Sequence, residues 1–268
     1  GLDTSYVGKR NILSGKISFI KKQFDKNIKL QKKFDFIIAR QVVEHIINPI
    51  EFFRTIRKNL NQNGKVFFEI PNLDWMLKNL SIWDFYYEHC CYYDYFILKK
   101  FLQLTGFKNI KNVNLFNGQY TGVYAEINNK RYSKNKIKFN FKNNSFKMRI
   151  SNFIAYKKKF DQKKKIIANF CERNKAINWG IWGCAAKGVT FVNSFVKNKI
   201  TSFKGFDINP QRQNKFLPIK GYKIYKPNQK NLKNTEMIVI MNPNYTKEIK
   251  FILKKMNYKG KIKAVHEI

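Results

Sequence analysis

Apolar and polar residues alternate in blocks between Phe34 and Asn72, and the blocks predict a βαβ unit. An apolar run is followed by a polar crossing, an amphipathic stretch, an Asn-Gly turn and a second apolar run. This order is typical of two parallel strands joined by a helix. Functional side chains of such a unit lie at the carboxyl ends of its strands, so we expect one crevice to collect Arg40, Gln41, Glu44, His45 and residues 69–72.

The same kind of pattern restarts in the last third of the chain. Residues 178–182 predict a strand and residues 183–188 a turn of small residues. Residues 189–197 have a helical pattern, and residues 203–207 predict a second strand. This is a Rossmann-like unit. Because small residues at a helix N-terminus let backbone amides approach an anion, the substrate-binding candidates here are Gly183, Lys187 and Gly188.

The remaining segments complete two α/β domains. The aromatic stretch at residues 73–96 predicts a lid over the substrate, and two antiparallel strands are expected at residues 107–116 and 119–127. A helix is expected from Tyr95 to Gly106. Residues 128–174 are polar and periodically apolar, which predicts a connecting helix. We therefore expect domains at residues 1–128 and 176–268, joined by a helical connector at residues 129–175.

The charge of the chain raises the question of a nucleic-acid partner. The chain has 268 residues and a formal net charge of +36, which by itself favours binding to phosphates. The lysines are spread along the whole chain, so we interpret them as a compositional bias and as a field that attracts anionic substrates such as nucleotide sugars. Methylation of nucleic acid is the alternative that charge alone supports.

The cysteines and the apolar runs exclude several other classes. The four cysteines have no paired spacing, so neither a disulfide framework nor a zinc knuckle is indicated. No run approaches the ~20 apolar residues of a membrane helix, and the first residues contain no apolar signal core. We expect a cytoplasmic protein with no membrane partner.

The densest polar cluster is Tyr86, Glu88 and His89, in an aromatic neighbourhood. Burial among rings perturbs proton affinities, and a histidine that titrates near neutrality is the usual general base. The alternative is a core histidine held by Glu88 or by a backbone group. The residues alone leave both interpretations open.

Several short sequences resemble a known family. A strand followed by Val-Val-Glu-His-Ile at residues 42–46, and a second strand ending Glu-Ile-Pro-Asn at residues 69–72, resemble class I S-adenosylmethionine-dependent methyltransferases. With the Tyr-x-Glu-His stretch at residues 86–89, Gly-x-Ala-Ala-Lys-Gly at residues 183–188, and the later Asp-x-Asn-Pro and Leu-Pro-Ile, the chain resembles the sugar C-methyltransferases of deoxysugar biosynthesis over nearly its whole length. The resemblance implies methylation of a nucleotide-linked sugar at a carbon next to a ketone, with S-adenosylmethionine as cofactor.

The resemblance also implies roles for individual residues. His89 is expected to remove the substrate proton, or to activate Tyr86 for that step, with Glu88 beside them and His45 as partner of the enolate. No metal is required for this chemistry. Asp3 would bind the ribose hydroxyls, although it is equally suited to cap a helix. The other cofactor candidates are Phe24, Arg40 and Gln41, and the other substrate candidates are Asn72, Asn117 and Tyr120.

The chain departs from the family pattern in two ways. The glycine-rich cofactor loop and the cysteine-rich zinc module are absent, so we expect an N-terminally truncated methyltransferase domain followed by a second Rossmann-like α/β domain. An upstream segment or a subunit would then supply the cofactor loop. Asn117-Gly118-Gln119-Tyr120 stands where the sugar enzymes have a His-Gly-Gly type of turn. The alternatives are therefore an O-methyltransferase of surface-polysaccharide precursors and a non-catalytic remnant.

Overall fold

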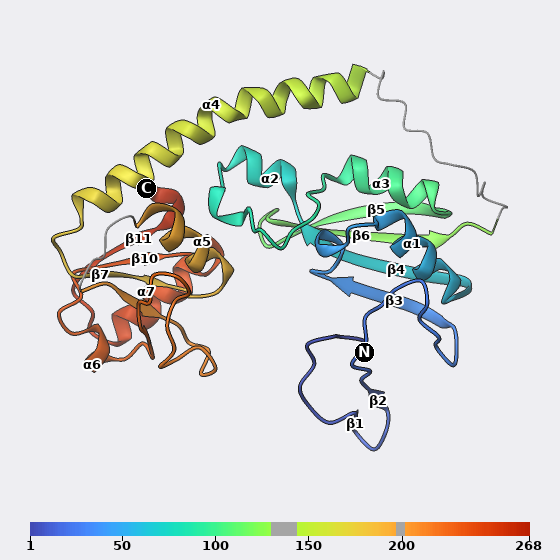
Figure 1. Ribbon diagram of the computed structural model, residues 1–268, viewed down its shortest axis with the longest axis horizontal. Coiled ribbons are helices and arrows are strands. Elements are labelled where there is room, and N and C mark those ends of the chain that lie inside the picture. Colours follow the sequence, from blue (N-terminus) through green and yellow to red (C-terminus); the bar gives the residue numbers. More distant parts are fainter. Residues whose placement is uncertain (130–143, 197–201) are drawn as a thin grey trace. The chain divides into compact units, whose positions relative to one another are not determined.

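The computed structural model of the chain describes residues 1–129, 144–196 and 202–268. Contacts between residues divide the chain into two compact units (Figure 1). The first unit contains residues 1–73 and the described part of 88–139, and the second contains residues 74–87 and the described part of 140–268. The predicted domain limits at residues 128 and 175 stay a prediction, and residues 130–143 of the expected connector lie outside the described residues.

The first unit is built on a four-stranded sheet with the order β3-β4-β6-β5. Its strands are β3 (Phe34–Arg40), β4 (Leu60–Pro71), β5 (Phe107–Leu115) and β6 (Tyr120–Ile127). The first pair is parallel and the other two pairs are antiparallel, so both the predicted βαβ unit and the antiparallel end of the sheet are present. A short hairpin of β1 (Asn11–Ile12) and β2 (Ile17–Ser18) precedes the sheet.

Two capped helices cover one face of this sheet. Helix α1 (Pro49–Lys58) begins after Asn48, whose side chain accepts a hydrogen bond from the first turn of the helix at 3.1 Å. Helix α3 (Tyr95–Leu104) begins in the same way after Asp94, at 2.8 Å. The inward side chains of both helices pack on alternate residues of β4 and β6 to form the core of the unit. The opposite face of the sheet carries exposed apolar side chains, among them Phe36, Ile38, Val113 and Tyr124.

The second unit contains a five-stranded sheet with the order β11-β10-β7-β8-β9. All its neighbouring strands are parallel. The central strand β7 therefore lies where the order reverses, which is the point at which open α/β sheets hold their ligands. The strands are β7 (Trp179–Trp182), β8 (Lys204–Phe206), β9 (Ile224–Tyr225), β10 (Met237–Ile240) and β11 (Lys261–Ala264).

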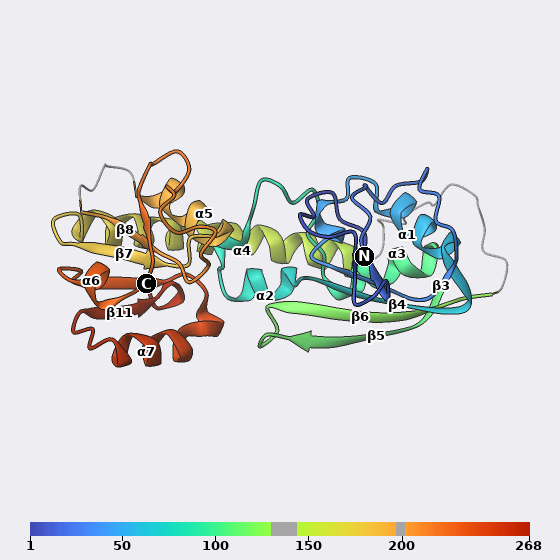
Figure 2. The same ribbon diagram turned by 90° about the horizontal axis from the view of Figure 1, so that it is seen from below.

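Helices pack on both faces of this second sheet, as Figure 2 shows. Helices α4 (Asn144–Arg173) and α5 (Ala186–Phe195) contribute to the core on one face, and α6 (Gln229–Leu232) and α7 (Thr246–Lys255) to the core on the other. Helix α2 (Leu73–Lys78) precedes a 3₁₀ helix at Ile82–Asp84 that also packs in the first of these cores. Further 3₁₀ helices are Val43–His45, Pro243–Tyr245 and Val265–Glu267.

The predicted fold class is confirmed, with one α/β unit on a mixed sheet followed by a Rossmann-like unit on a parallel sheet. One boundary differs, because helix α5 begins at Ala186, three residues before the predicted Val189. Alanine and lysine have high helix propensity, so the end of the small-residue turn joins the helix. The predicted end of that helix at residue 197 lies outside the described residues. Among the described residues, no helix combines the length and the apolar composition that crossing a membrane requires.

Candidate active site

The crossing after β3 determines where Glu44 and His45 lie. Gln41 follows the strand with a left-handed backbone (φ 53°), and its N–H donates to the carbonyl oxygen of Glu69 at 2.9 Å. The 3₁₀ helix Val43–His45 comes next, and its first side chain is fully buried. This turn buries the side chain of Glu44, which is only 1% exposed, and leaves His45 exposed.

The segment that begins at Glu88 is attached to this turn through its backbone. The Cys91 N–H donates to the carbonyl oxygen of Glu44 at 3.1 Å, and His45 Nδ1 lies 3.1 Å from the carbonyl oxygen of Glu88. The thiols of Cys90 and Cys91 donate to the carbonyl oxygens of His45 and Ile46. As a result, His89 contacts His45 with ring centroids 4.8 Å apart and planes at 87°. The structure therefore brings together the two histidines that the sequence predicted.

Glu44, His45 and His89 form an ionisable cluster, since one side-chain nitrogen or oxygen atom from each lies within 4.8 Å of those of the other two. Burial lowers the pKa of His89 to about 4, assisted by repulsion from His45 and opposed by Glu88. Burial raises the pKa of Glu44 to about 7, opposed by its own backbone and by His45, and assisted by Glu69. At neutral pH the His89 ring is therefore neutral, with a nitrogen that can accept a proton.

Arg40 and Gln41 meet on a single carboxylate at the carboxyl ends of β3 and β4. Arg40 binds Glu69 through two hydrogen bonds, Nε to Oε2 at 3.0 Å and Nη2 to Oε1 at 3.2 Å. The Gln41 side-chain amide donates to the same Oε1 at 3.3 Å. The guanidinium charge of Arg40 is therefore balanced within the protein, and Glu69 orients both cofactor candidates.

The structure places the other two cofactor candidates away from this carboxylate. Asp3 is exposed and outside the four-stranded sheet, and one of its carboxylate oxygens accepts hydrogen bonds from the amide and the hydroxyl of Ser5, each at 2.7 Å. These bonds lower the pKa of Asp3, so its carboxylate is ionised and chemically suited to a diol. Phe24 packs on Phe52 with ring centroids 5.7 Å apart and is partly buried against the core.

Three predicted substrate residues meet at the end of β4. The side-chain amide of Asn72 donates to the carbonyl oxygen of Gly118 at 3.0 Å. Asn117 lies in the same turn with a left-handed backbone (φ 56°), and Tyr120 begins the strand that follows. Asn72 also forms a bridge with Tyr93, which links this turn to the loop that carries His89. Residues at the carboxyl ends of β3 and β4 therefore have partners in the first unit, and a single crevice that collects them stays a prediction.

Tyr86 and Lys187 belong to the second unit, where both bind Asp84. The Tyr86 hydroxyl donates to Asp84 Oδ1 at 3.0 Å, and the Lys187 ammonium forms a short ion pair with the same oxygen. The Ser81 hydroxyl donates to the other carboxylate oxygen. Burial lowers the pKa of Lys187 to about 7, and its side chain is 11% exposed. The Lys187 ammonium therefore faces a protein carboxylate, and the binding of substrate by this residue stays a prediction.

Gly183 and Gly188 allow helix α5 to approach strand β7 closely. A Cβ atom at Gly188 would lie 2.1 Å from the carbonyl oxygen of Gly183, which itself has a φ of 106°. The next amide, that of Cys184, donates to Asp207 Oδ2 at 2.9 Å. The acid at the end of β8 thus closes the small-residue turn through the backbone, as in a tightly packed Rossmann-like unit.

The sequence placed Glu69 in the expected crevice without a role of its own, and it gave no role to Asp84. Each is a buried acid inside an otherwise apolar or aromatic stretch, and each binds two or more of the predicted side chains. An acid in such a stretch is a usable signal, because a charged group is seldom buried without a partner. Its partners cannot be read from the sequence, since they come from distant elements.

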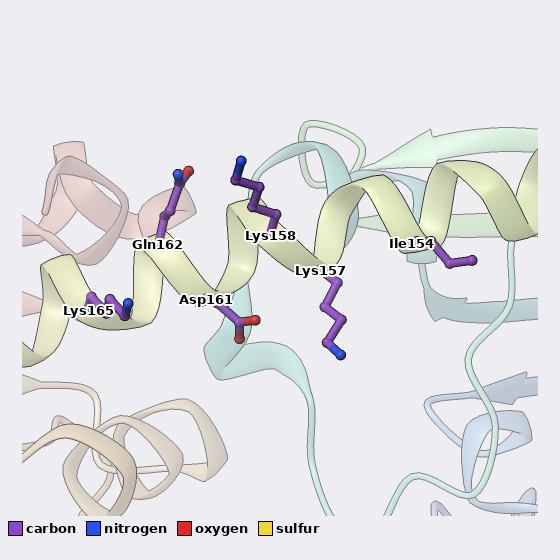
Figure 3. A pocket seen from close by; sticks show the side chains of 6 residues that line it. All are labelled: Ile154, Lys157, Lys158, Asp161, Gln162 and Lys165. Carbon is purple, nitrogen blue, oxygen red and sulfur yellow. The ribbon is translucent and has the colours of Figure 1, made fainter.

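A hollow of about 430 Å³ along helix α4 does not form a further site. Its lining residues all come from that one helix and are exposed, and in Figure 3 Lys158 and Gln162 point to one side while Lys157 and Asp161 point to the other. No charged groups converge there. We therefore place the candidate chemistry on the histidine cluster.

Two protein-family models match the chain. Residues 1–112 match a methyltransferase domain, and residues 124–266 match the C-methyltransferase C-terminal domain. A search of curated proteins gave no match.

Solved structures also resemble the chain, at low similarity. An S-adenosylmethionine-dependent methyltransferase from Thermotoga maritima has 16% identity and a TM-score of 0.35, with 42% of this chain and 64% of that chain covered. One from Clostridium acetobutylicum has 14% identity and a TM-score of 0.34, with 42% and 65% covered. The N-methyltransferase NodS from Bradyrhizobium japonicum, in complex with S-adenosyl-L-homocysteine, has 12% identity and a TM-score of 0.31, with 42% and 55% covered. The chain thus spans between half and two thirds of the length of these proteins.

Proposed function

The chain belongs to the methyltransferase family that carries the C-methyltransferase C-terminal domain, and we propose that the protein methylates a carbon next to a ketone in a nucleotide-linked sugar. The model of the C-methyltransferase C-terminal domain covers more than half of the chain, at residues 124–266. The model of the methyltransferase domain covers most of the remainder, at residues 1–112. This assignment confirms the predicted resemblance to class I S-adenosylmethionine-dependent methyltransferases. Methyl transfer from S-adenosylmethionine is therefore the premise of the proposal.

The contact between His45 and His89 is the observation that supports carbon methylation best. A carbon next to a ketone becomes nucleophilic only after it loses a proton, so the site needs a base and a group that stabilises the enolate. Two imidazoles with ring centroids 4.8 Å apart offer both functions within the reach of one substrate. An oxygen or nitrogen acceptor does not require the second group.

We assign the proton transfer to His89. The C–H bond of the substrate breaks, its electron pair stays on the enolate, and the proton bonds to the neutral His89 ring. In its imidazolium form, His45 donates Nδ1–H to the Glu88 carbonyl oxygen and can donate Nε2–H to the enolate oxygen. S-adenosylmethionine, when bound, would supply the methyl group that bonds to the enolate carbon as its methyl–sulfur bond breaks. Tyr86 remains a candidate for the proton transfer, with Asp84 fixing its hydroxyl, and the carboxylate of Glu88 remains a candidate beside His89.

The residues of the first unit fit the cofactor in part. S-adenosylmethionine, when bound, supplies an electrophilic methyl group on its sulfonium. Asp3 offers an ionised, exposed carboxylate that can accept hydrogen bonds from ribose hydroxyls. Arg40 and Gln41 are oriented by Glu69 at the carboxyl end of the sheet, and Phe24 is the candidate for the adenine.

The remaining candidates define how the protein would bind its substrate. The amide and phenol groups of Asn72, Asn117 and Tyr120 suit sugar hydroxyls, and the positive field of the chain suits the diphosphate of an activated sugar. Gly183, Lys187 and Gly188 stay part of the proposal through their backbone amides, because the Lys187 ammonium is already paired with Asp84. A cytoplasmic location is part of the same proposal.

The test is the identity of the methylated atom. The protein is incubated with S-adenosylmethionine labelled with carbon-13 on its methyl group and with a panel of nucleotide-linked 3- and 4-ketohexoses. We expect a labelled methyl group bonded to carbon, identified by the carbon-13 chemical shift of the product. A methyl group on oxygen would replace the proposal with O-methylation. No transfer to any sugar, while the cofactor still binds, would support a non-catalytic role.

A further inference from the structure

Glu44 is a buried carboxylate that the reaction described above does not use. Its side chain is 1% exposed, and neither carboxylate oxygen has a hydrogen-bond partner in any other described residue. Burying a charged group without partners is costly, and a hydrophobic or amide side chain of similar size would avoid that cost. The Glu44 position is nevertheless well defined, because its backbone carbonyl accepts the Cys91 N–H. This combination points to a function for the carboxylate and not to a role in packing.

The groups that face Glu44 come from several elements. His45 shares its 3₁₀ helix, and His89 comes from the loop after residue 87. The other ionisable neighbours are acids or weak acids, namely Glu69 on β4, whose charge is balanced by Arg40, and Tyr93 in the loop before α3. The two imidazoles are therefore the neighbours with which a carboxylate can share a proton. One nitrogen atom of each ring and one carboxylate oxygen lie within 4.8 Å of one another.

We propose that Glu44 is a positioning residue for the histidine pair, whose negative charge stabilises the imidazolium that forms when His89 takes the substrate proton. This inference rests on the proposed function. The proton that leaves carbon is bonded to the His89 ring, and Glu44 supplies the opposite charge from a buried position. Burial keeps the His89 ring neutral before the reaction, and the charge of Glu44 stabilises the imidazolium once it forms.

The variant that tests this inference is Glu44→Gln, which keeps the shape of the side chain and removes its charge. Its matched control is Glu248→Gln, which removes an exposed carboxylate from helix α7. With a nucleotide-linked ketosugar that the wild type methylates, we expect Glu44→Gln to lower kcat roughly 10²-fold with KM for both substrates within about twofold. The acid limb of the kcat/KM profile near pH 7, where Glu44 loses its proton, should disappear. The control should keep the wild-type profile.

A second measurement needs no substrate. The chain has three histidines, so the imidazole nitrogens of a nitrogen-15 histidine-labelled sample can be followed by NMR as the pH changes. We expect the titration curve of His89 to contain a step near pH 7 in the wild type and in Glu248→Gln, and to lose that step in Glu44→Gln.

The outcomes separate the two proposals. Identical His89 curves in the wild type and Glu44→Gln, or unchanged kcat and pH profile in Glu44→Gln, would overturn the role of Glu44 and leave carbon methylation standing. If the wild type methylates no ketosugar but its His89 titration curve still has a step near pH 7 that depends on Glu44, the proposed function is wrong. The interaction between Glu44 and His89 would still stand. A melting temperature that Zn²⁺ raises in the wild type but not in Glu44→Gln would assign the carboxylate to a cation and overturn the inference.

Discussion

At the scale of single residues, burial gives the two central groups opposite proton affinities. Burial removes water from both groups and so destabilises their charged forms. It therefore favours the neutral ring of His89 and the protonated carboxyl of Glu44. Neither effect requires an unusual residue type. Sequence reasoning could name His89 and His45 from their types and positions, but the pKa values follow from contacts that only the folded chain contains.

These shifts predict opposite contributions to the pH dependence of stability. The pKa of Glu44 is higher in the folded state, so its contribution makes the protein lose stability as the pH rises from about 4.5 to about 7. The pKa of His89 is lower in the folded state, so its contribution makes the protein gain stability as the pH rises from about 4 to about 6.5. Glu44→Gln should therefore be more stable than the wild type above pH 7, by up to about 3 kcal/mol, and the gain should vanish below pH 4.5.

Urea denaturation at several pH values measures these contributions. In His89→Asn, the free energy of unfolding should still fall as the pH rises from about 4.5 to about 7, because Glu44 is kept. In Glu44→Gln, it should still rise between about pH 4 and 6.5, because His89 is kept. Parallel stability profiles for the wild type and Glu44→Gln between pH 4.5 and 8 would contradict the burial of an ionised carboxylate at this position.

At the scale of secondary-structure elements, the contact between Asp84 and Lys187 explains why residues 74–87 group with the second unit. The 3₁₀ helix that ends at Asp84 packs in the core beside α5, and the ion pair joins the two elements. Lys187 lies in the first turn of its helix, where the macrodipole disfavours a cation, so the carboxylate also compensates for that position.

Removing one member of this pair should destabilise the second unit. Lys187→Met leaves Asp84 buried without its cation, and we expect a loss of about 3–5 kcal/mol in the free energy of unfolding. The double variant Asp84→Asn with Lys187→Met should recover most of that loss, because no charge remains buried. Thermal or denaturant unfolding measures both. If Lys187→Met is as stable as the wild type, Lys187 is not bound to Asp84 in solution. Its ammonium would then be available to the substrate.

At the scale of the whole molecule, the order of apolar runs and turns was sufficient to predict two α/β units. The periodicity between Phe34 and Asn72 gave the parallel pair β3-β4, and the small-residue turn at residues 183–188 gave the start of the second sheet. The partners of buried charges could not be predicted in this way. Lys187 was predicted to bind the substrate, and its local sequence does not indicate its partner Asp84, which lies more than a hundred residues earlier in the chain. Long-range pairing is invisible to local patterns.

The central claim is that the protein makes a carbon nucleophile by removing a proton next to a ketone, and solvent exchange measures that step most directly. A nucleotide-linked ketosugar is incubated with the protein in deuterated water without methyl donor, and deuterium at the carbon next to the ketone is followed by proton NMR. We expect the wild type to exchange this position faster than buffer does, and His89→Asn to lower the enzymatic rate by roughly 10²-fold or more while S-adenosylmethionine still binds. Exchange at the buffer rate by an active wild-type enzyme, or equal exchange by His89→Asn, would contradict the account.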